Sequence, residues 1–148
     1  MSLDPTYKDL NRASTGRIKK LAFTLTDDEM QTRVGEHWTV SMALAHLAFW
    51  DRRVLCVLDM TAKEGKLSMP QIDIVVNDLS LPFWAAIPPR EAARLAVETA
   101  EELDRRLEEY PQDLLEEIYN FNQRWVIRAI HRNGHLDEVD AALKNVSP

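Results

Sequence analysis

The sequence is short of glycine, cysteine and long apolar runs, and each shortage narrows the folds it can adopt. Only four glycines occur among 148 residues, and long stretches pass without glycine or proline, which favours helices over a turn-rich β fold. The single cysteine, Cys56, excludes an internal disulfide and fits a reducing compartment. No run of about 18 apolar residues is present, so no segment is expected to span a bilayer.

A surplus of basic residues is also lacking. The chain carries 18 Lys and Arg residues against 24 Asp and Glu residues, a formal net charge of −6 at pH 7. This acidity argues against binding to nucleic acid or to an anionic membrane surface. The N-terminal residues show no basic-then-apolar signal pattern, so we expect a cytoplasmic protein. The length suits a single domain over residues 1–148.

Helical periodicity dominates what is present. Apolar residues recur three or four positions apart in four segments. These segments are residues 5–25, 39–62, 88–110 and 113–144, the last broken around residues 120–123. Thr39 is the expected N-cap of the second segment. The pattern predicts an all-α protein built as a four-helix bundle.

The lengths of the connections favour one topology for this bundle. The third and fourth segments are joined by a few residues, so they should be antiparallel neighbours. The long connection, residues 63–88, reaches about 80 Å when extended, whereas the second helix would be only about 35 Å long. The connection can therefore cross the bundle and let the second and third helices run parallel. This gives an up-down-down-up order, with up-down-up-down as the alternative.

Three histidines form a candidate metal site. His131 and His135 are four residues apart, so their rings share one helix face and can share one ion. His46 lies about 10 Å along the second helix, and antiparallel second and last helices would bring it to the same depth. The alternative is that these are ordinary surface or core histidines. His37, just before the second helix, is expected to be a capping or surface residue.

Two better-defined metal motifs are absent. The zincin motif HExxH needs a glutamate after its first histidine, and Arg132 follows His131 here. A di-iron bundle needs a glutamate three residues before a histidine. The residues three before His46, His131 and His135 are Ala43, Arg128 and Arg132. The sequence therefore predicts a three-histidine site of another kind.

At this point the sequence resembles the DinB-like superfamily of damage-inducible, metal-binding four-helix bundles. The resemblance lies in WTVSMALAH over residues 38–46 and HRNGHLDE over residues 131–138, together with the helix order and the long second connection. It implies an up-down-down-up bundle whose metal ligands are His46, His131 and His135. Characterised relatives include mycothiol-dependent maleylpyruvate isomerase and related thiol transferases, and dimers are common among them. The resemblance therefore implies a small-molecule substrate and a homodimer.

Three functional hypotheses follow from such a site. Three neutral histidines leave an open position on a divalent zinc, nickel or iron ion, as catalytic sites do. The first hypothesis is a metal-dependent transferase or isomerase, such as a thiol S-transferase, that uses a low-molecular-weight thiol cosubstrate. The second is a metal-dependent hydrolase with Glu138 as base, although Glu138 is better explained as a solvated residue or as a partner of His135. The third is a non-catalytic stress-related module that binds a ligand.

Neighbouring residues define the expected substrate pocket, although no catalytic residue is evident. Arg128 lies seven residues before His135, so it projects in nearly the same direction and could bind an anionic substrate. Its alternative is a surface salt bridge on a basic helix face. Trp50 lies one turn beyond His46 and could line the pocket or belong to the core. Cys56 is expected to be a buried structural residue rather than a nucleophile.

Overall fold

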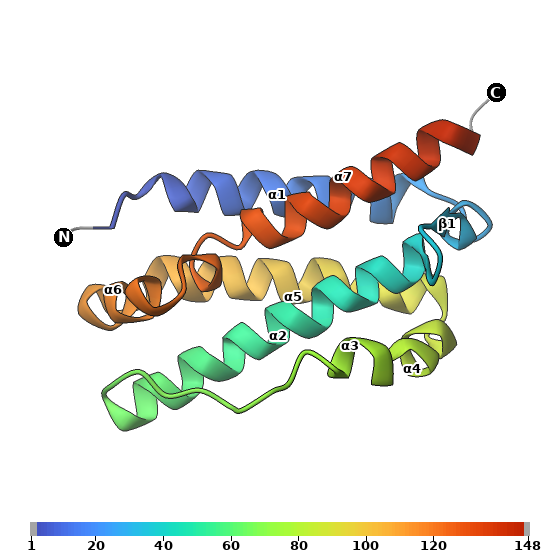
Figure 1. Ribbon diagram of the computed structural model, residues 1–148. Coiled ribbons are helices and arrows are strands. Elements are labelled where there is room, and N and C mark those ends of the chain that lie inside the picture. Colours follow the sequence, from blue (N-terminus) through green and yellow to red (C-terminus); the bar gives the residue numbers. More distant parts are fainter. Residues whose placement is uncertain (1–2, 147–148) are drawn as a thin grey trace.

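The computed structural model describes residues 3–146, and four long helices make up most of it (Figure 1). They are α1 (Thr6–Thr24), α2 (Val40–Glu64), α5 (Pro89–Glu109) and α7 (Ala129–Val146). The shorter helices are η1 (Glu29–Gln31), α3 (Val76–Leu79), α4 (Leu81–Ala86), α6 (Gln112–Phe121) and η2 (Gln123–Trp125). The strands are β1 (Arg33–Val34) and β2 (Trp38–Thr39), which pair as a small antiparallel hairpin. The predicted all-α class is therefore confirmed.

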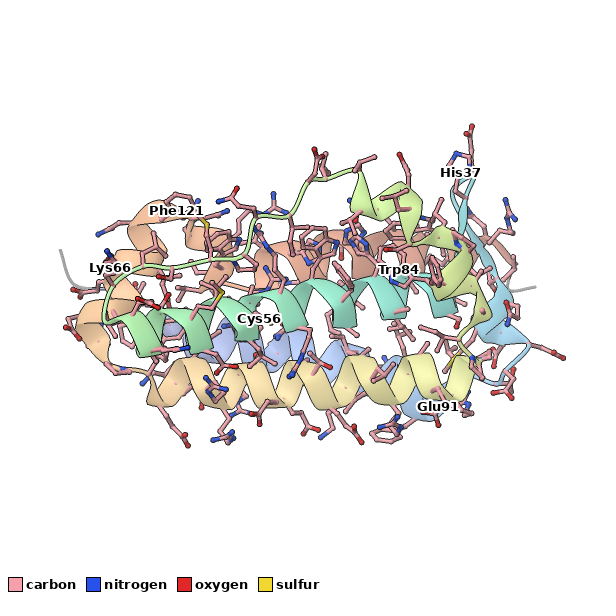
Figure 2. All side chains as sticks on the ribbon, turned by 90° about the horizontal axis from the view of Figure 1, so that it is seen from below. His37, Cys56, Lys66, Trp84, Glu91 and Phe121 are labelled. Carbon is pink, nitrogen blue, oxygen red and sulfur yellow. The ribbon has the colours of Figure 1, made fainter. Side chains whose placement is uncertain are left out.

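The long helices lie side by side in two directions. In Figure 1, α1 and α7 run towards one end of the molecule, and α2 and α5 run back towards the other. Helix α5 packs against both α1 and α2, and α7 packs against α1 and, more sparsely, against α2. The connection between α2 and α5 returns along α2 before it forms α3 and α4 (Figures 1 and 2). This arrangement places α2 and α7 antiparallel.

The ends of α2 follow from local sequence. The side chain of Thr39 accepts a hydrogen bond from the backbone N–H of Met42, as predicted for the N-cap. Gly65 ends the helix with φ of 73°, a left-handed conformation that glycine adopts without a Cβ clash. The cap at Thr39 fixes where α2 begins. It thereby also fixes the position of His46, which lies on the second turn of the helix.

Apolar side chains of the long helices form the core. One cluster joins α1, α2, α5 and α7 near the hairpin and includes the fully buried Ile18, Leu44 and Leu136. A second cluster lies nearer the other end, where Leu58, Leu107 and α6 pack together. A third, smaller cluster places Trp84 of α4 against the outer side of α2. The connection between α2 and α5 is therefore anchored to the helices by an aromatic side chain.

Polar side chains also enter the interior, where periodicity alone predicts apolar ones. On α1, Asn11, Ser14 and Thr15 are buried whereas Leu10 is 48% exposed. The facing helices bury charged side chains, and these polar groups contact them.

Among residues 3–146, no helix is both long and apolar enough to cross a membrane.

Candidate metal centre

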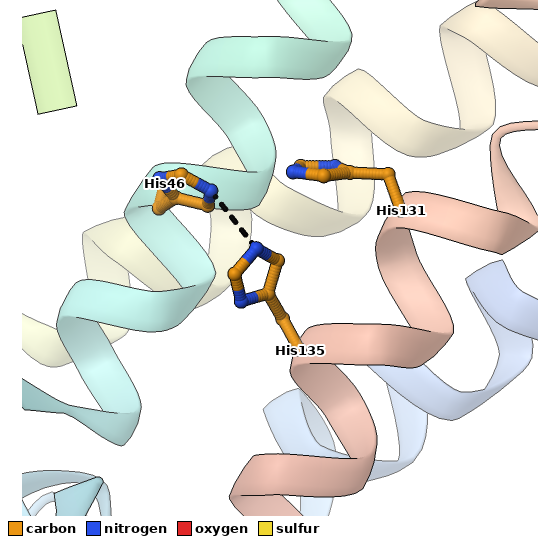
Figure 3. A group of neighbouring side chains, drawn as sticks. All are labelled: His46, His131 and His135. Atoms are coloured by element: carbon orange, nitrogen blue, oxygen red, sulfur yellow. Dashed lines mark hydrogen bonds between the residues drawn. The ribbon is translucent and has the colours of Figure 1, made fainter. Parts of the chain in front are cut away.

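Two helices bring the three histidines together. His46 comes from α2, and His131 and His135 come from successive turns of α7 (Figure 3). One ligand atom from each ring lies within 4.8 Å of the others. The closest pair is His46 Nε2 and His135 Nε2, which are 3.1 Å apart. The antiparallel course of α2 and α7 is what places these side chains at the same depth.

Aromatic rings form a wall beside this cluster. The ring centroid of Trp38 lies 4.5 Å from that of His46 and 5.3 Å from that of His135. The centroid of Trp84 lies 5.2 Å from that of His46, edge to face. Rings packed in this way limit rotation of the imidazoles. The hairpin and α4 thus help to fix the histidines, although neither carries one of them.

Burial keeps the histidines uncharged. Desolvation, followed by the charges of neighbouring groups, lowers the pKa of His46 to about 3 and that of His131 to about 2. Desolvation also lowers the pKa of His135, against the opposing effect of Glu138. A histidine binds a metal ion through a neutral ring nitrogen. All three rings are therefore neutral near pH 7, the charge state in which an imidazole binds a metal ion.

Glu138 orients His135. Its Oε1 lies 3.0 Å from Nδ1 of His135, one turn away on α7. In the neutral ring, Nδ1–H donates to this carboxylate and leaves the Nε2 lone pair directed at His46. This is the carboxylate–histidine pairing that fixes the tautomer of metal ligands. Of the two roles considered for Glu138, the geometry matches that of a partner to His135.

Arg128 constrains His131 in a different way. Its Nη2 lies 3.1 Å from Nδ1 of His131. Arginine only donates hydrogen bonds, so Nδ1 accepts and the proton of the neutral ring lies on Nε2. To bind an ion through Nε2, His131 must move this proton to Nδ1, and Arg128 must then give up the contact. Metal binding at His131 is thereby coupled to the conformation of Arg128.

Arg128 also belongs to a buried charged network. Its Nε donates to Asp51 at 2.8 Å, and Nη1 donates to the backbone oxygen of Arg124 at 3.0 Å. Arg132 donates to the other oxygen of Asp51 at 3.0 Å and to Asp104 at 2.8 Å. Arg128 is 4% exposed and Arg132 is fully buried. Neither arginine forms the surface salt bridge considered from the sequence, and the donors of Arg128 are engaged inside the protein.

A cavity opens beside the histidines. It has a volume of about 480 Å³ and is lined by Trp38, His46, Trp50, Arg53, Ile72, Ile74, Asn77, His131 and His135. Trp50 donates a hydrogen bond from Nε1 to Asn77 at 2.9 Å, which ties α2 to α3 across the cavity. A smaller cavity of about 190 Å³ lies on the other side of Trp50 and His131. A small molecule can therefore reach the histidines from the cavity.

The donor set fits one divalent metal ion. Two nitrogens bound to a tetrahedral ion lie roughly 3.3 Å apart, close to the 3.1 Å between His46 and His135. The other ring nitrogen of His46, Nδ1, is buried with no hydrogen-bond partner in the described part of the chain. An unsatisfied polar atom of this kind is uncommon unless the site has a function. His46, His131 and His135 are thus placed where together they could bind a metal ion.

Two other residues considered from the sequence lie away from the cluster. Cys56 is exposed on α2 (Figure 2), so the expectation of a buried cysteine was wrong. Its neighbours in the sequence, Leu55 and Val57, are buried. They lie on the apolar face that α2 packs against the core, whereas Cys56 lies on the outer face. The side chain of His37 is 72% exposed and points away from the helices (Figure 2).

The sequence analysis missed the acidic partners of the arginines. Asp51 and Asp104 are fully buried, and both occur at inward-facing positions of mostly apolar helix faces. An acidic residue at such a position is costly to bury unless it is paired, and this was the available signal. Arg53, which lines the larger cavity, was also missed.

Comparisons with family models, with curated proteins and with solved structures each find no match to this chain.

Proposed function

We propose that the chain is a DinB-like four-helix bundle of up-down-down-up order that binds one divalent ion through His46, His131 and His135. We further propose that it acts as a metal-dependent transferase or isomerase on a low-molecular-weight thiol. The observation that carries the proposal is the convergence of three neutral histidines on a cavity large enough for a small molecule. Three protein ligands that face a cavity are typical of catalytic sites, whereas structural sites are closed by a fourth.

Each residue around the site has a distinct part in this proposal. Glu138 holds His135 with its Nε2 lone pair towards the ion. Trp38 and Trp84 pack against His46, which keeps its ring in place and excludes water from that side. Trp50 lines the cavity where the thiol would bind. The ion, when bound, would favour the thiolate, which is the reactive form of a thiol.

The hydrolase hypothesis has less support from the geometry. A hydrolase would need a carboxylate base free to take a proton from water. Glu138 Oε1 is engaged with His135, and its side chain is 61% exposed rather than enclosed in the cavity. The described residues that line the larger cavity include no Asp or Glu. A cosubstrate that supplies its own thiol removes the need for such a base.

Elemental analysis followed by cobalt substitution tests the proposal. The purified protein should contain close to one divalent ion per chain, and His37→Ala, remote from the cluster, should retain it. In the Co²⁺ form, titration with a small thiol should produce sulfur-to-cobalt charge-transfer absorption. Metal well below one equivalent would refute the metal site. A thiol titration that leaves the cobalt spectrum unchanged would refute the thiol chemistry and favour the third hypothesis, a non-catalytic module.

A further inference from the structure

Two arginines near the histidines lack the acidic partners that most arginines of this chain have. Arg12, for example, pairs with Glu108 at 2.7 Å, and Arg90 pairs with Asp27 at 2.7 Å. Arg53 and Arg124 are two of the four arginines that form no ion pair with a carboxylate among residues 3–146. The protein has a formal net charge of −6, so carboxylates are plentiful. Leaving two guanidinium groups unneutralised beside a cavity therefore favours an anionic ligand there.

Both arginines border the space next to the histidines. Arg53 lines the larger cavity together with the three histidines. Arg124 lines the smaller cavity together with Trp50, Trp125 and His131. Because Trp50 and His131 line both cavities, the two arginines lie in adjacent cavities next to the histidines.

Stacking orients the guanidinium of Arg53. Its Cζ lies 5.6 Å from the ring centroid of Trp50 and 4.7 Å from that of Trp125. Stacking on aromatic rings occupies the flat faces of a guanidinium and leaves its N–H edge available. Arg53 Nε is buried and has no hydrogen-bond partner in residues 3–146, so the terminal nitrogens form the edge of the guanidinium that a ligand can reach. A planar carboxylate matches such an edge.

We propose that Arg53 and Arg124 form the anion-binding part of the substrate site and that the small molecule it takes carries a carboxylate. The proposal rests on the proposed function, because it places the reactive thiol of that molecule at the histidines and its carboxylate at the arginines. Arg128 also lines the smaller cavity, but its Nε is paired with Asp51 and its Nη1 with a backbone oxygen, so we do not assign this role to it. The carboxylate-recognising residues thus belong to α2 and to η2, and each lines one of the two adjacent cavities.

A pair of thiols tests the proposal in the Co²⁺ form. The probes are 3-mercaptopropionate, which carries a carboxylate, and 2-mercaptoethanol, which does not. Wild type should bind the carboxylate probe about tenfold or more tightly, as expected for a charge-assisted hydrogen bond. R53Q and R124Q should each remove most of this preference, and the double variant should abolish it. R52Q is the matched control, because Arg52 neighbours Arg53 but lines a different cavity.

A second arm does not depend on the metal. In metal-free protein, propionate should change tryptophan fluorescence more than propionamide does, because Trp50 and Trp125 contact Arg53. The difference should shrink with added salt and disappear in the R53Q/R124Q variant. Arg124 is exposed, so R124Q is expected to keep the fold and can carry the test alone if R53Q does not fold.

The two arms separate the two proposals. If Co²⁺ fails to bind but metal-free wild type still prefers propionate through Arg53 and Arg124, the metal-dependent function is wrong and the anion site stands. If wild type shows no preference for the carboxylate probe in either arm, the anion site is overturned. The same holds if the preference survives in R53Q/R124Q or is lost equally in R52Q.

Discussion

Two pairs of polar side chains alternate along α7 and the residue just before it, and the groups that surround the two pairs differ. Arg128 and Arg132 are buried, and both are paired with Asp51. His131 and His135 line a cavity, where their rings approach His46. Each also has one contact on its own side of the site, His131 with Arg128 and His135 with Glu138. The first pair resembles a structural polar core, in which buried groups find partners within the chain. The second pair lines the cavity at which we propose that a metal ion binds.

The arginine network joins all four long helices. Arg132 of α7 contacts Asp51 of α2 and Asp104 of α5, and Thr15 of α1 donates a hydrogen bond to Asp104. Desolvation raises the pKa of Asp104 against the opposing charge of Arg132. The network therefore costs desolvation energy, but it fixes α7 against α2. That fixed geometry is what places His131 and His135 opposite His46.

Removal of Arg132 should have the largest effect on stability. Arg132→Met leaves Asp51 and Asp104 partly unpaired inside the protein, and we expect the free energy of unfolding to fall by about 3–5 kcal/mol. The measurement is urea denaturation followed by circular dichroism. Arg17→Gln, which breaks ion pairs at the surface, should cost no more than about 1 kcal/mol. Equal effects of the two variants would contradict a structural role for the buried network.

Acidification should destabilise the histidine cluster. The folded-state pKa of His46 is about 3, below its unfolded value of about 6.5. Between these values the unfolded chain binds more protons, so stability falls as the pH falls from 6.5 towards 3. At pH 5 the loss from this one histidine is about 2 kcal/mol.

The comparison of wild type with His46→Gln isolates this effect. Urea denaturation of both metal-free proteins between pH 7 and pH 5 gives the slope of unfolding free energy against pH. The slope of unfolding free energy against pH should be shallower in the variant. The expected difference is at most that of one bound proton, about 1.4 kcal/mol per pH unit. Identical slopes would mean that His46 titrates normally in the folded protein.

Loss of the carboxylate beside His135 should weaken metal binding more modestly. Glu138→Gln keeps a hydrogen-bond acceptor for Nδ1 but removes the negative charge, and we expect a decrease of about tenfold in metal affinity. Competition with a chromogenic chelator measures it. Glu36→Gln, beside the exposed His37, should leave the affinity unchanged. If Glu138→Gln binds the metal with unchanged affinity, then Glu138 does not support His135 as a ligand and is a solvated residue.

Substitution of Cys56 should have the smallest effect on stability and metal binding. Cys56 contacts neither the buried arginines nor the histidine cluster. It is exposed on α2 and lies about 15 Å along the helix from His46. Cys56→Ser should change the unfolding free energy by less than about 0.5 kcal/mol and should leave metal binding intact. Native Cys56 should react rapidly with a thiol reagent. A loss of metal in Cys56→Ser would show that the cluster extends further than the three histidines.

The sequence carried enough information to predict the long helices. Their apolar periodicity and the cap at Thr39 place α2 within about two residues of its observed ends. The hairpin and α4 were not predicted, because two-residue strands and a six-residue helix are too short to show periodicity. Tertiary packing places them, through Trp38 and Trp84.

For the candidate site, residue spacing predicted proximity but not hydrogen bonding. The four-residue interval between His131 and His135 fixes a shared helix face whatever the rest of the fold. Arg128 and Arg132 are also four residues apart, but this spacing does not identify their partner. Arg128 pairs with Asp51, which is 77 positions away in the sequence. Which nitrogen of His131 carries the proton follows from that long-range arrangement. Local sequence therefore locates the ligands, whereas the charged residues around them can be assigned only from the three-dimensional structure.

The most direct test of the central claim is metal titration of His46→Ala beside wild type and His37→Ala. Two histidines on one helix should bind a divalent ion far more weakly than three that converge, so we expect His46→Ala to lose at least about a hundredfold in affinity. Wild type and His37→Ala should each bind one ion per chain with equal affinity. Retention of one tightly bound ion by His46→Ala would contradict the three-histidine centre.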